Sequence, residues 1–171
     1  MTRNSLTKQD RDRLLAMEDA QLLRHCRQDV MRGSGPGGQK RNRTESAVRL
    51  TVQGTQIQVV CDKTRSQAKN RELALRELRL RLALDCRFPT RDAETEWTEP
   101  PPVKRPEFSL WVARVLDVFA GHGWQAGETA RALKTSTNHF SRGVLSDDRV
   151  LRAVNRERER LGLRALKSSH K

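Results

Sequence analysis

The sequence contains no long apolar run and no segment that resembles a targeting signal. Its longest apolar stretches are far shorter than the roughly 18 residues that a membrane-spanning helix needs. The first fifteen residues, MTRNSLTKQDRDRLL, have no apolar core of a secretory signal. Acidic residues at Asp10, Asp12, Glu18 and Asp19 argue against an organelle transit peptide. We therefore expect a cytoplasmic protein that does not associate with a membrane.

Cysteine is scarce and its spacing excludes two kinds of cross-link. Cys26, Cys61 and Cys86 are odd in number and widely separated, and no CxxC pair occurs. Neither a disulfide framework nor a zinc site is indicated by this pattern. The expectation is three buried or incidental thiols in a reducing compartment, with no metal or other cofactor.

Acidic residues are too few to balance the basic ones. The 171 residues include 34 Lys and Arg against 21 Asp and Glu, a net charge of +13 and a pI near 10.9. A balance this basic points to nucleic acid or an anionic surface as a partner. The length suits one medium domain or two small ones, and no internal repeat is visible.

One stretch lacks core residues altogether. No bulky apolar residue occurs between Met31 and Val48, and residues 32–50, RGSGPGGQKRNRTESAVRL, hold four of the ten glycines. Glycine reaches backbone conformations closed to other residues, so such a loop can press its backbone against another molecule. The cations Lys40, Arg41 and Arg43, just behind the glycines, indicate that this molecule is an anion.

Two nucleotide-binding interpretations of this loop are disfavoured. Gly33, Gly35 and Gly38 fit the GxGxxG spacing, but that motif needs an apolar strand before it and a crossover helix after it. A strand resumes by Ala47, too soon for a crossover of a dozen or more residues. The Walker pattern fails because Gln39, rather than Lys, follows Gly38.

The segments GSGPGGQ, NRTESAVRL and TRSQAKNRELA together resemble the catalytic domain of class-I peptide chain release factors, whose hallmark is Gly-Gly-Gln. The resemblance covers about residues 26–84. It implies hydrolysis of the ester between a finished peptide and tRNA in the peptidyl transferase centre of the ribosome, with Gly37, Gly38 and Gln39 as the catalytic residues. Lys40-Arg41 departs from the family, in which His or another small or neutral residue often follows the Gln.

The chemistry of ester hydrolysis suits these residue types. The reaction passes through a tetrahedral oxyanion, which a preorganised backbone N–H in a water-poor site stabilises by about 3–4 kcal/mol. Gly37 and Gly38 would allow close backbone approach, the Gln39 N–H would donate, and the Gln39 amide would orient water without titrating. Contacts to RNA are expected from neighbouring residues: Ser34, Gly35, Pro36, Lys40, Arg41, Asn42, Arg43, Thr44, Arg65, Ser66, Asn70 and Arg71.

Class-I factors that recognise stop codons are about twice this length and carry a codon-recognition domain, which no segment here resembles. The resemblance is therefore to a codon-independent rescue factor, with stalled ribosomes or free large subunits and peptidyl-tRNA as partners. Known rescue relatives use a disordered basic tail, whereas this chain predicts a folded helical module. Two alternatives remain open: a non-catalytic RNA-binding protein, and a DNA-binding regulator.

The expected fold is α+β, with a frayed or partner-dependent arm over residues 1–18 and a catalytic domain over 19–86. Alternation predicts strands over residues 26–31, 48–52 and 57–61 in an antiparallel sheet. Asp19 is expected to be the N-cap of a short helix, and Ser66 is expected to cap a long helix that ends near Leu84. On the long helix Leu75, Leu78 and Leu82 face the sheet, while Leu73, Leu80 and Leu84 lie on nearly the opposite side without an assigned cover.

Residues 87–106 hold five of the six prolines and predict a stiff, extended linker, in which Trp97 packs on one domain. Residues 107–171 predict a helical domain. Its aromatic stripe over 108–119 is typical of a core, residues 127–145 resemble a helix-turn-helix unit, and the last helix over 147–161 begins a basic end. We expect a monomer whose helical domain is available to a protein partner.

Overall fold

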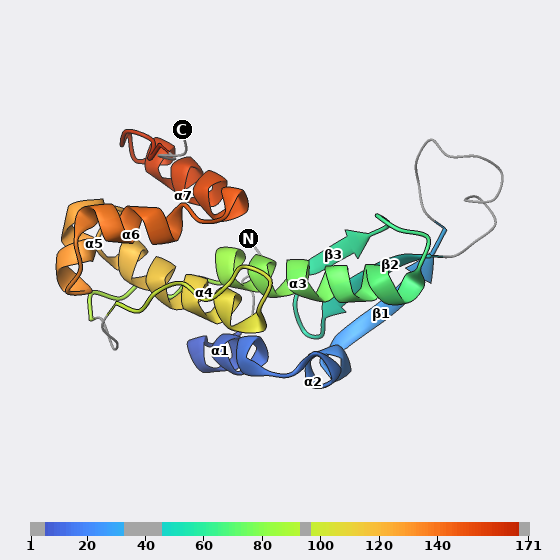
Figure 1. Ribbon diagram of the computed structural model, residues 1–171. Coiled ribbons are helices and arrows are strands. Elements are labelled where there is room, and N and C mark those ends of the chain that lie inside the picture. The colour runs from blue at the N-terminus through green and yellow to red at the C-terminus, as the bar shows by residue number, and fades with distance from the viewer. Residues whose placement is uncertain (1–5, 33–45, 93–96, 168–171) are drawn as a thin grey trace. The chain divides into compact units, whose positions relative to one another are not determined.

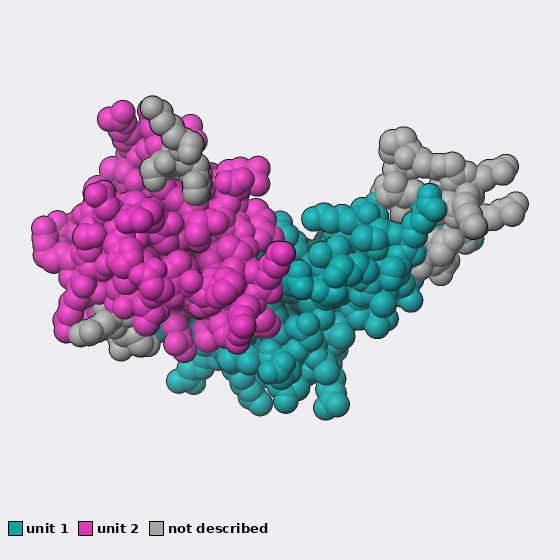
Figure 2. Space-filling model, in the orientation of Figure 1, with its two compact units in different colours: residues 1–82 teal, residues 83–171 magenta. Residues whose placement is uncertain are grey.

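The computed structural model describes residues 6–32, 46–92 and 97–167 (Figure 1). The chain divides into two compact units, residues 1–82 and 83–171 (Figure 2). The first has the order α1 (Lys8–Ala16), α2 (Asp19–Arg24), β1 (Cys26–Met31), β2 (Ala47–Val52), β3 (Gln58–Cys61) and most of α3 (Gln67–Asp85). The second contains α4 (Pro106–Gly121), α5 (Ala126–Ala132), α6 (Thr137–Val144) and α7 (Asp148–Arg160). The α+β prediction is confirmed, and no helix within the described ranges is long and apolar enough to span a bilayer.

The sheet of unit 1 has the order β1-β2-β3, and both pairings are antiparallel. Val48, Leu50 and Val52 are buried, while the intervening Arg49 and Thr51 are partly exposed, as the alternation of side chains along a strand requires. Gly54 turns the chain between β2 and β3 with φ of +71°, a conformation that favours glycine. The three predicted strands are therefore confirmed.

Helix α3 supplies the other side of the unit 1 core. Leu75, Leu78 and Leu82 are buried as predicted, and each contributes about 1.5–3 kcal/mol of hydrophobic stabilisation relative to an exposed side chain. On the opposed face Leu80 is also buried, and Leu73 is half-buried. That face is therefore largely covered.

The described part of residues 1–18 forms a packed helix, which differs from the expected arm. Helix α1 begins with a capping box in which Thr7 and Asp10 exchange hydrogen bonds with each other's backbone. Leu14 and Leu15 are buried. Helix α2 also differs in detail, because its N-cap is Glu18 and Asp19 is already its first residue.

The buried guanidinium of Arg79 on α3 holds the end of α1. Its Nη1 donates to Leu15 O at 3.0 Å, and its Nη2 donates to Met17 O at 2.6 Å and to the Asp19 carboxylate at 2.9 Å. These bonds satisfy carbonyl groups that the last turn of a helix leaves without partners. The contact joins residues more than 60 positions apart, so the local sequence pattern did not reveal it.

Replacing Arg79 with Met is expected to lower the free energy of unfolding by about 2 kcal/mol, because α1 carbonyl groups lose their donors. Urea unfolding followed by far-UV circular dichroism measures the effect. All three tryptophans lie in unit 2 and the chain has no tyrosine, so fluorescence does not report on unit 1. Arg76→Met on the exposed side of the same helix is the control and should change stability by less than about 0.5 kcal/mol. Equal effects of the two substitutions would contradict this role of Arg79.

All three cysteines are free and buried, as expected from their spacing. The Cys26 thiol donates to Leu22 O at 3.3 Å, and burial raises its pKa to about 11. A thiolate is the reactive form, so we expect iodoacetamide at pH 8 to modify Cys26 about 100-fold more slowly in the folded chain than in urea. Peptide mapping by mass spectrometry measures this ratio, and similar rates in the two states would refute the assignment.

Unit 2 is built on the aromatic stripe of α4, which is buried as predicted. Phe119 lies at the centre, with Phe140 of α6 at 4.9 Å and Trp124 at 5.1 Å between ring centroids. Lys134 takes a φ of +54° just after α5, in the turn of the predicted helix-turn-helix unit. Glycine is the usual residue at such a position. Asp147 caps α7 by accepting a hydrogen bond from Arg149 N.

The described residues of the proline-rich segment pack against unit 2, whereas the composition predicted a stiff, extended linker. Phe88 N donates to the Asp117 carboxylate, and Trp97 N donates to Leu133 O. The absence of a side chain at Gly121 permits this packing, because a Cβ there would lie 1.9 Å from Thr90 O. Only glycine therefore allows this segment to approach α4.

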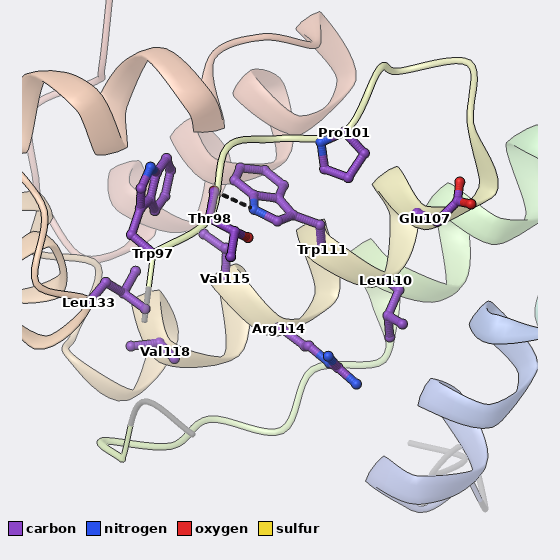
Figure 3. Close-up of a pocket in the computed structure, with 10 residues that line it drawn as sticks. All are labelled: Trp97, Thr98, Pro101, Glu107, Leu110, Trp111, Arg114, Val115, Val118 and Leu133. Atoms are coloured by element: carbon purple, nitrogen blue, oxygen red, sulfur yellow. Dashed lines mark hydrogen bonds between the residues drawn. The ribbon is translucent and has the colours of Figure 1, made fainter. Parts of the chain in front are cut away.

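Trp97 packs on this unit as predicted. Its ring lies 5.4 Å from the Trp111 ring, edge to face, and 5.8 Å from Phe140. A Cβ at Gly143 would come within 2.6 Å of the Trp97 ring. Trp97 and Trp111 line a cavity of about 230 Å³ between this segment and α4. The Trp111 indole donates a hydrogen bond to Thr98 O (Figure 3). The tryptophans thus attach the segment to the helix.

Candidate functional site

The glycine-rich segment connects β1 to β2, and the structure describes its base. The three predicted catalytic residues, Gly37, Gly38 and Gln39, lie outside the described residues. So do eight of the expected RNA contacts: Ser34, Gly35, Pro36, Lys40, Arg41, Asn42, Arg43 and Thr44. The remaining four, Arg65, Ser66, Asn70 and Arg71, lie at or near the start of α3.

The two ends of the segment are fixed by an antiparallel pair of strands. Six residue pairs connect β1 and β2, and the last of them is Met31 with Ala47. Facing residues of such a pair have Cα atoms about 5 Å apart. The cross-strand pair Asp29 and Arg49 adds an ion pair of 3.0 Å between Oδ2 and Nε. Both are about one-third exposed, so this pair specifies register more than it adds stability.

Asn70 joins three segments at this base. Its side-chain Nδ2 donates to Ser46 O and to Thr64 O, both at 2.8 Å. Its Oδ1 accepts from Thr64 N at 2.8 Å and from the Thr64 hydroxyl at 3.0 Å. Ser46 is the residue directly before β2, and Thr64 precedes α3. One amide therefore connects the exit of the glycine-rich segment to the start of the long helix.

The expected RNA contact of Asn70 is not compatible with this arrangement. The residue is fully buried, and both amide donors and the amide oxygen bind the chain itself. A buried polar group with all its hydrogen bonds made inside the protein holds structure rather than a ligand. Asn70 is therefore a positioning residue. Asn70 was expected to contact RNA because it lies in TRSQAKNRELA, one of the segments that resemble release factors. Only the fold reveals its distant partner Ser46.

Ser66 acts as the N-cap of α3, as predicted. Its hydroxyl accepts from Lys69 N at 3.2 Å, and its own N–H donates to the Thr64 hydroxyl. Ser66 and Arg65 are both exposed. The cap therefore leaves the two side chains on the surface of the turn that Asn70 holds.

The turn between β3 and α3 also carries basic side chains. Lys63 and Arg65 are exposed, and Arg71 is half-buried. Arg71 Nε is enclosed and has no acceptor among the described residues. Lys69, in contrast, is paired with Glu72 at 2.8 Å, and this hydrogen bond lowers the pKa of the Glu72 carboxyl. The turn can therefore attract an anion, mainly through Lys63 and Arg65.

Comparison with known proteins finds a family model that matches part of the chain. Residues 22–100 match the RF-1 domain. Over this stretch the chain is similar to peptide chain release factors. The match includes the sheet, α3 and the proline-rich segment up to Pro100.

Relatives of the RF-1 domain are peptide chain release factors from bacteria. Peptide chain release factor RF2 of Thermus thermophilus is 61% identical over 54 residues, which are 32% of this chain and 14% of the relative. Peptide chain release factor 1 of Treponema pallidum is 59% identical over 56 residues, or 33% of this chain and 16% of the relative. The matched stretch is thus about one-seventh of the length of these relatives. No solved structure matches the chain.

Proposed function

We propose that this protein is a codon-independent release factor that triggers hydrolysis of the peptidyl-tRNA ester on stalled ribosomes or free large subunits. The observation that carries the proposal is the RF-1 domain match, which includes Gly37-Gly38-Gln39 on a segment anchored at both ends. An antiparallel strand pair and the Asn70 amide fix the two ends of that segment. Such anchoring would limit how far the glycines stray from a productive position.

The chemical roles follow from the residue types. The backbone N–H of Gln39 would donate to the tetrahedral oxyanion, with Gly37 and Gly38 allowing the approach, and the Gln39 amide would orient the attacking water. No titrating group takes part in this scheme. Phosphates of ribosomal RNA would be contacted by cations on the loop and the α3 turn, including Lys40, Arg41, Arg43, Arg65 and Arg71. The other loop contacts remain proposals of the same kind: Ser34, Gly35, Pro36, Asn42, Thr44 and the exposed Ser66.

Codon independence is supported by the helices that follow the RF-1 domain match. The family match ends at residue 100, and the residues beyond it form helices α4–α7. Our proposal assigns these helices to recognition of the stalled state. It also implies a monomer that acts on the cytoplasmic ribosome, with unit 2 available to a further partner.

The experiment compares release of labelled peptide from three complexes with peptidyl-tRNA in the P site. These are ribosomes with an empty A site, ribosomes with a stop codon in the A site, and isolated large subunits. We expect release from at least one complex without a codon, at a rate that a stop codon does not increase. Release only when a stop codon is present would contradict codon independence, and RNA binding without any release would favour the RNA-binding alternative.

A further inference from the structure

Helix α7 of unit 2, whose place in the fold is labelled in Figure 1, has a buried apolar face and a face of arginines. Val150 and Val154 are at most 1% exposed and face the core of the unit. Four arginines follow one another at spacings of three or four residues on the opposite side: Arg149, Arg152, Arg156 and Arg160. At 1.5 Å per residue they form a line of about 16 Å, which we call the arginine row.

This arrangement opposes helix stability. Residues three or four apart on a helix are neighbours, and like charges at these spacings repel. Arg149 is paired with Asp147 and Arg160 with Glu157. Arg152 and Arg156, the two exposed members in the middle, form no ion pair with any residue that the structure describes. A helix face selected only for stability would place acidic residues three or four positions from these arginines.

The chain after α7 adds further cations beside the row. Asn155 binds the backbone of Leu166 in both directions, at 2.9 Å and 2.8 Å. The buried Arg158 donates to Arg164 O through Nε at 2.9 Å and Nη2 at 2.7 Å. The backbone of residues 163–167 is therefore held against α7, with the side chains of Arg164 and Lys167 exposed. Residues 129–171 contain eleven Lys and Arg against four Asp and Glu.

We propose that the arginine row, with Arg164 and Lys167, binds the phosphate backbone of RNA. Arginine presents a planar set of donors that matches phosphate oxygens in pairs, and α7 contains five arginines and no lysine. A bound polyanion would also neutralise the repulsion within the row.

The other anionic partners fit less well. Helices that lie on membranes need an exposed apolar face, and the apolar face of α7 is buried in its own unit. Protein partners are held by apolar or aromatic anchors in pockets. Among the described residues from 148 to 167, Leu161 is the only large apolar side chain that is exposed, and no aromatic residue accompanies it. The inference goes beyond the proposed function, because it assigns a ligand to unit 2 and does not depend on ester hydrolysis.

The test uses the full-length double variant Arg152→Gln, Arg156→Gln and a labelled single-stranded RNA of about 20 nucleotides. Each phosphate contact contributes about 0.7 to the slope of log K against log salt concentration for single strands. Fluorescence anisotropy from 50 to 300 mM KCl should therefore show a slope smaller by about 1.4 and, near 100 mM salt, an affinity about 25-fold weaker. Glutamine preserves helix propensity, so α7 should remain folded.

The matched control is Lys104→Gln, Arg105→Gln, which removes the same charge from exposed residues before α4. We expect this control to retain most of the wild-type slope. The pair Arg152→Lys, Arg156→Lys should retain the slope with weaker binding, because charge is kept and paired donation is lost.

Equal losses in the Gln variant and its control would overturn the proposal. So would loss of binding to phosphatidylserine vesicles with RNA binding unchanged. RNA binding is measured without ribosomes, so failure here is distinct from failure to release peptide.

Discussion

Asn70→Ala is expected to lower the free energy of unfolding by about 3 kcal/mol and to slow peptide release. The substitution removes the donors to Ser46 O and Thr64 O and the acceptor for Thr64 N. Each buried polar group left without a partner costs about 1–3 kcal/mol, and the losses are not fully additive. Because Ser46 ends the glycine-rich segment, its release would also loosen the exit of the proposed catalytic loop. Urea unfolding followed by far-UV circular dichroism measures the first effect.

Release must be measured at a temperature at which the variant remains folded, so that lost stability does not appear as lost activity. Asn155→Ala is the control, because it removes a comparable two-bond amide contact from unit 2. We expect Asn155→Ala to destabilise by about 1–2 kcal/mol. At saturating protein it should leave the rate constant of peptide release unchanged, because Asn155 holds part of the proposed RNA-binding surface and not the catalytic loop. If folded Asn70→Ala releases peptide at the wild-type rate, Asn70 stabilises the unit without positioning the loop.

Local patterns predict the framework of unit 1 and the core of unit 2. The alternation of Val48, Leu50 and Val52 identifies β2, and Ser66 followed by the leucines of α3 identifies the long helix. These signals work because each element buries a face whose period is visible within a few residues. The aromatic stripe of α4 is predicted by the same reasoning. The class of fold and the position of the candidate loop therefore follow from sequence alone.

Contacts between distant residues explain what local patterns do not predict. Helix α1 has a thin apolar stripe, and the buried Arg79 that binds its last carbonyls lies on α3. The proline-rich segment has the composition of a linker, yet Gly121 and Gly143 create the space in which its residues pack. The role of Asn70 is hidden in the same way, because its partner Ser46 is 24 residues away.

Gly38→Ala is expected to reduce the rate of peptide release by about 10²–10³-fold. The reason is the proposed donation from the Gln39 N–H, which a side chain at position 38 would displace from the oxyanion. A loss of this size corresponds to about 3–4 kcal/mol of transition-state stabilisation. RNA binding should be retained, because the substitution removes no charge. Gly127→Ala in α5 is the control, since a Cβ there meets no atom within 4 Å.

The most direct test of the account is single-turnover release of labelled peptide from stalled ribosomes by the wild-type chain and by Gly38→Ala. Saturating amounts of each protein, with ribosome binding measured in parallel, separate the chemical step from binding. The account predicts rapid release by the wild type and by Gly127→Ala, and a 10²–10³-fold slower reaction with Gly38→Ala at equal occupancy. Equal release by the wild type and Gly38→Ala, or no release by a wild-type chain that binds, would contradict it.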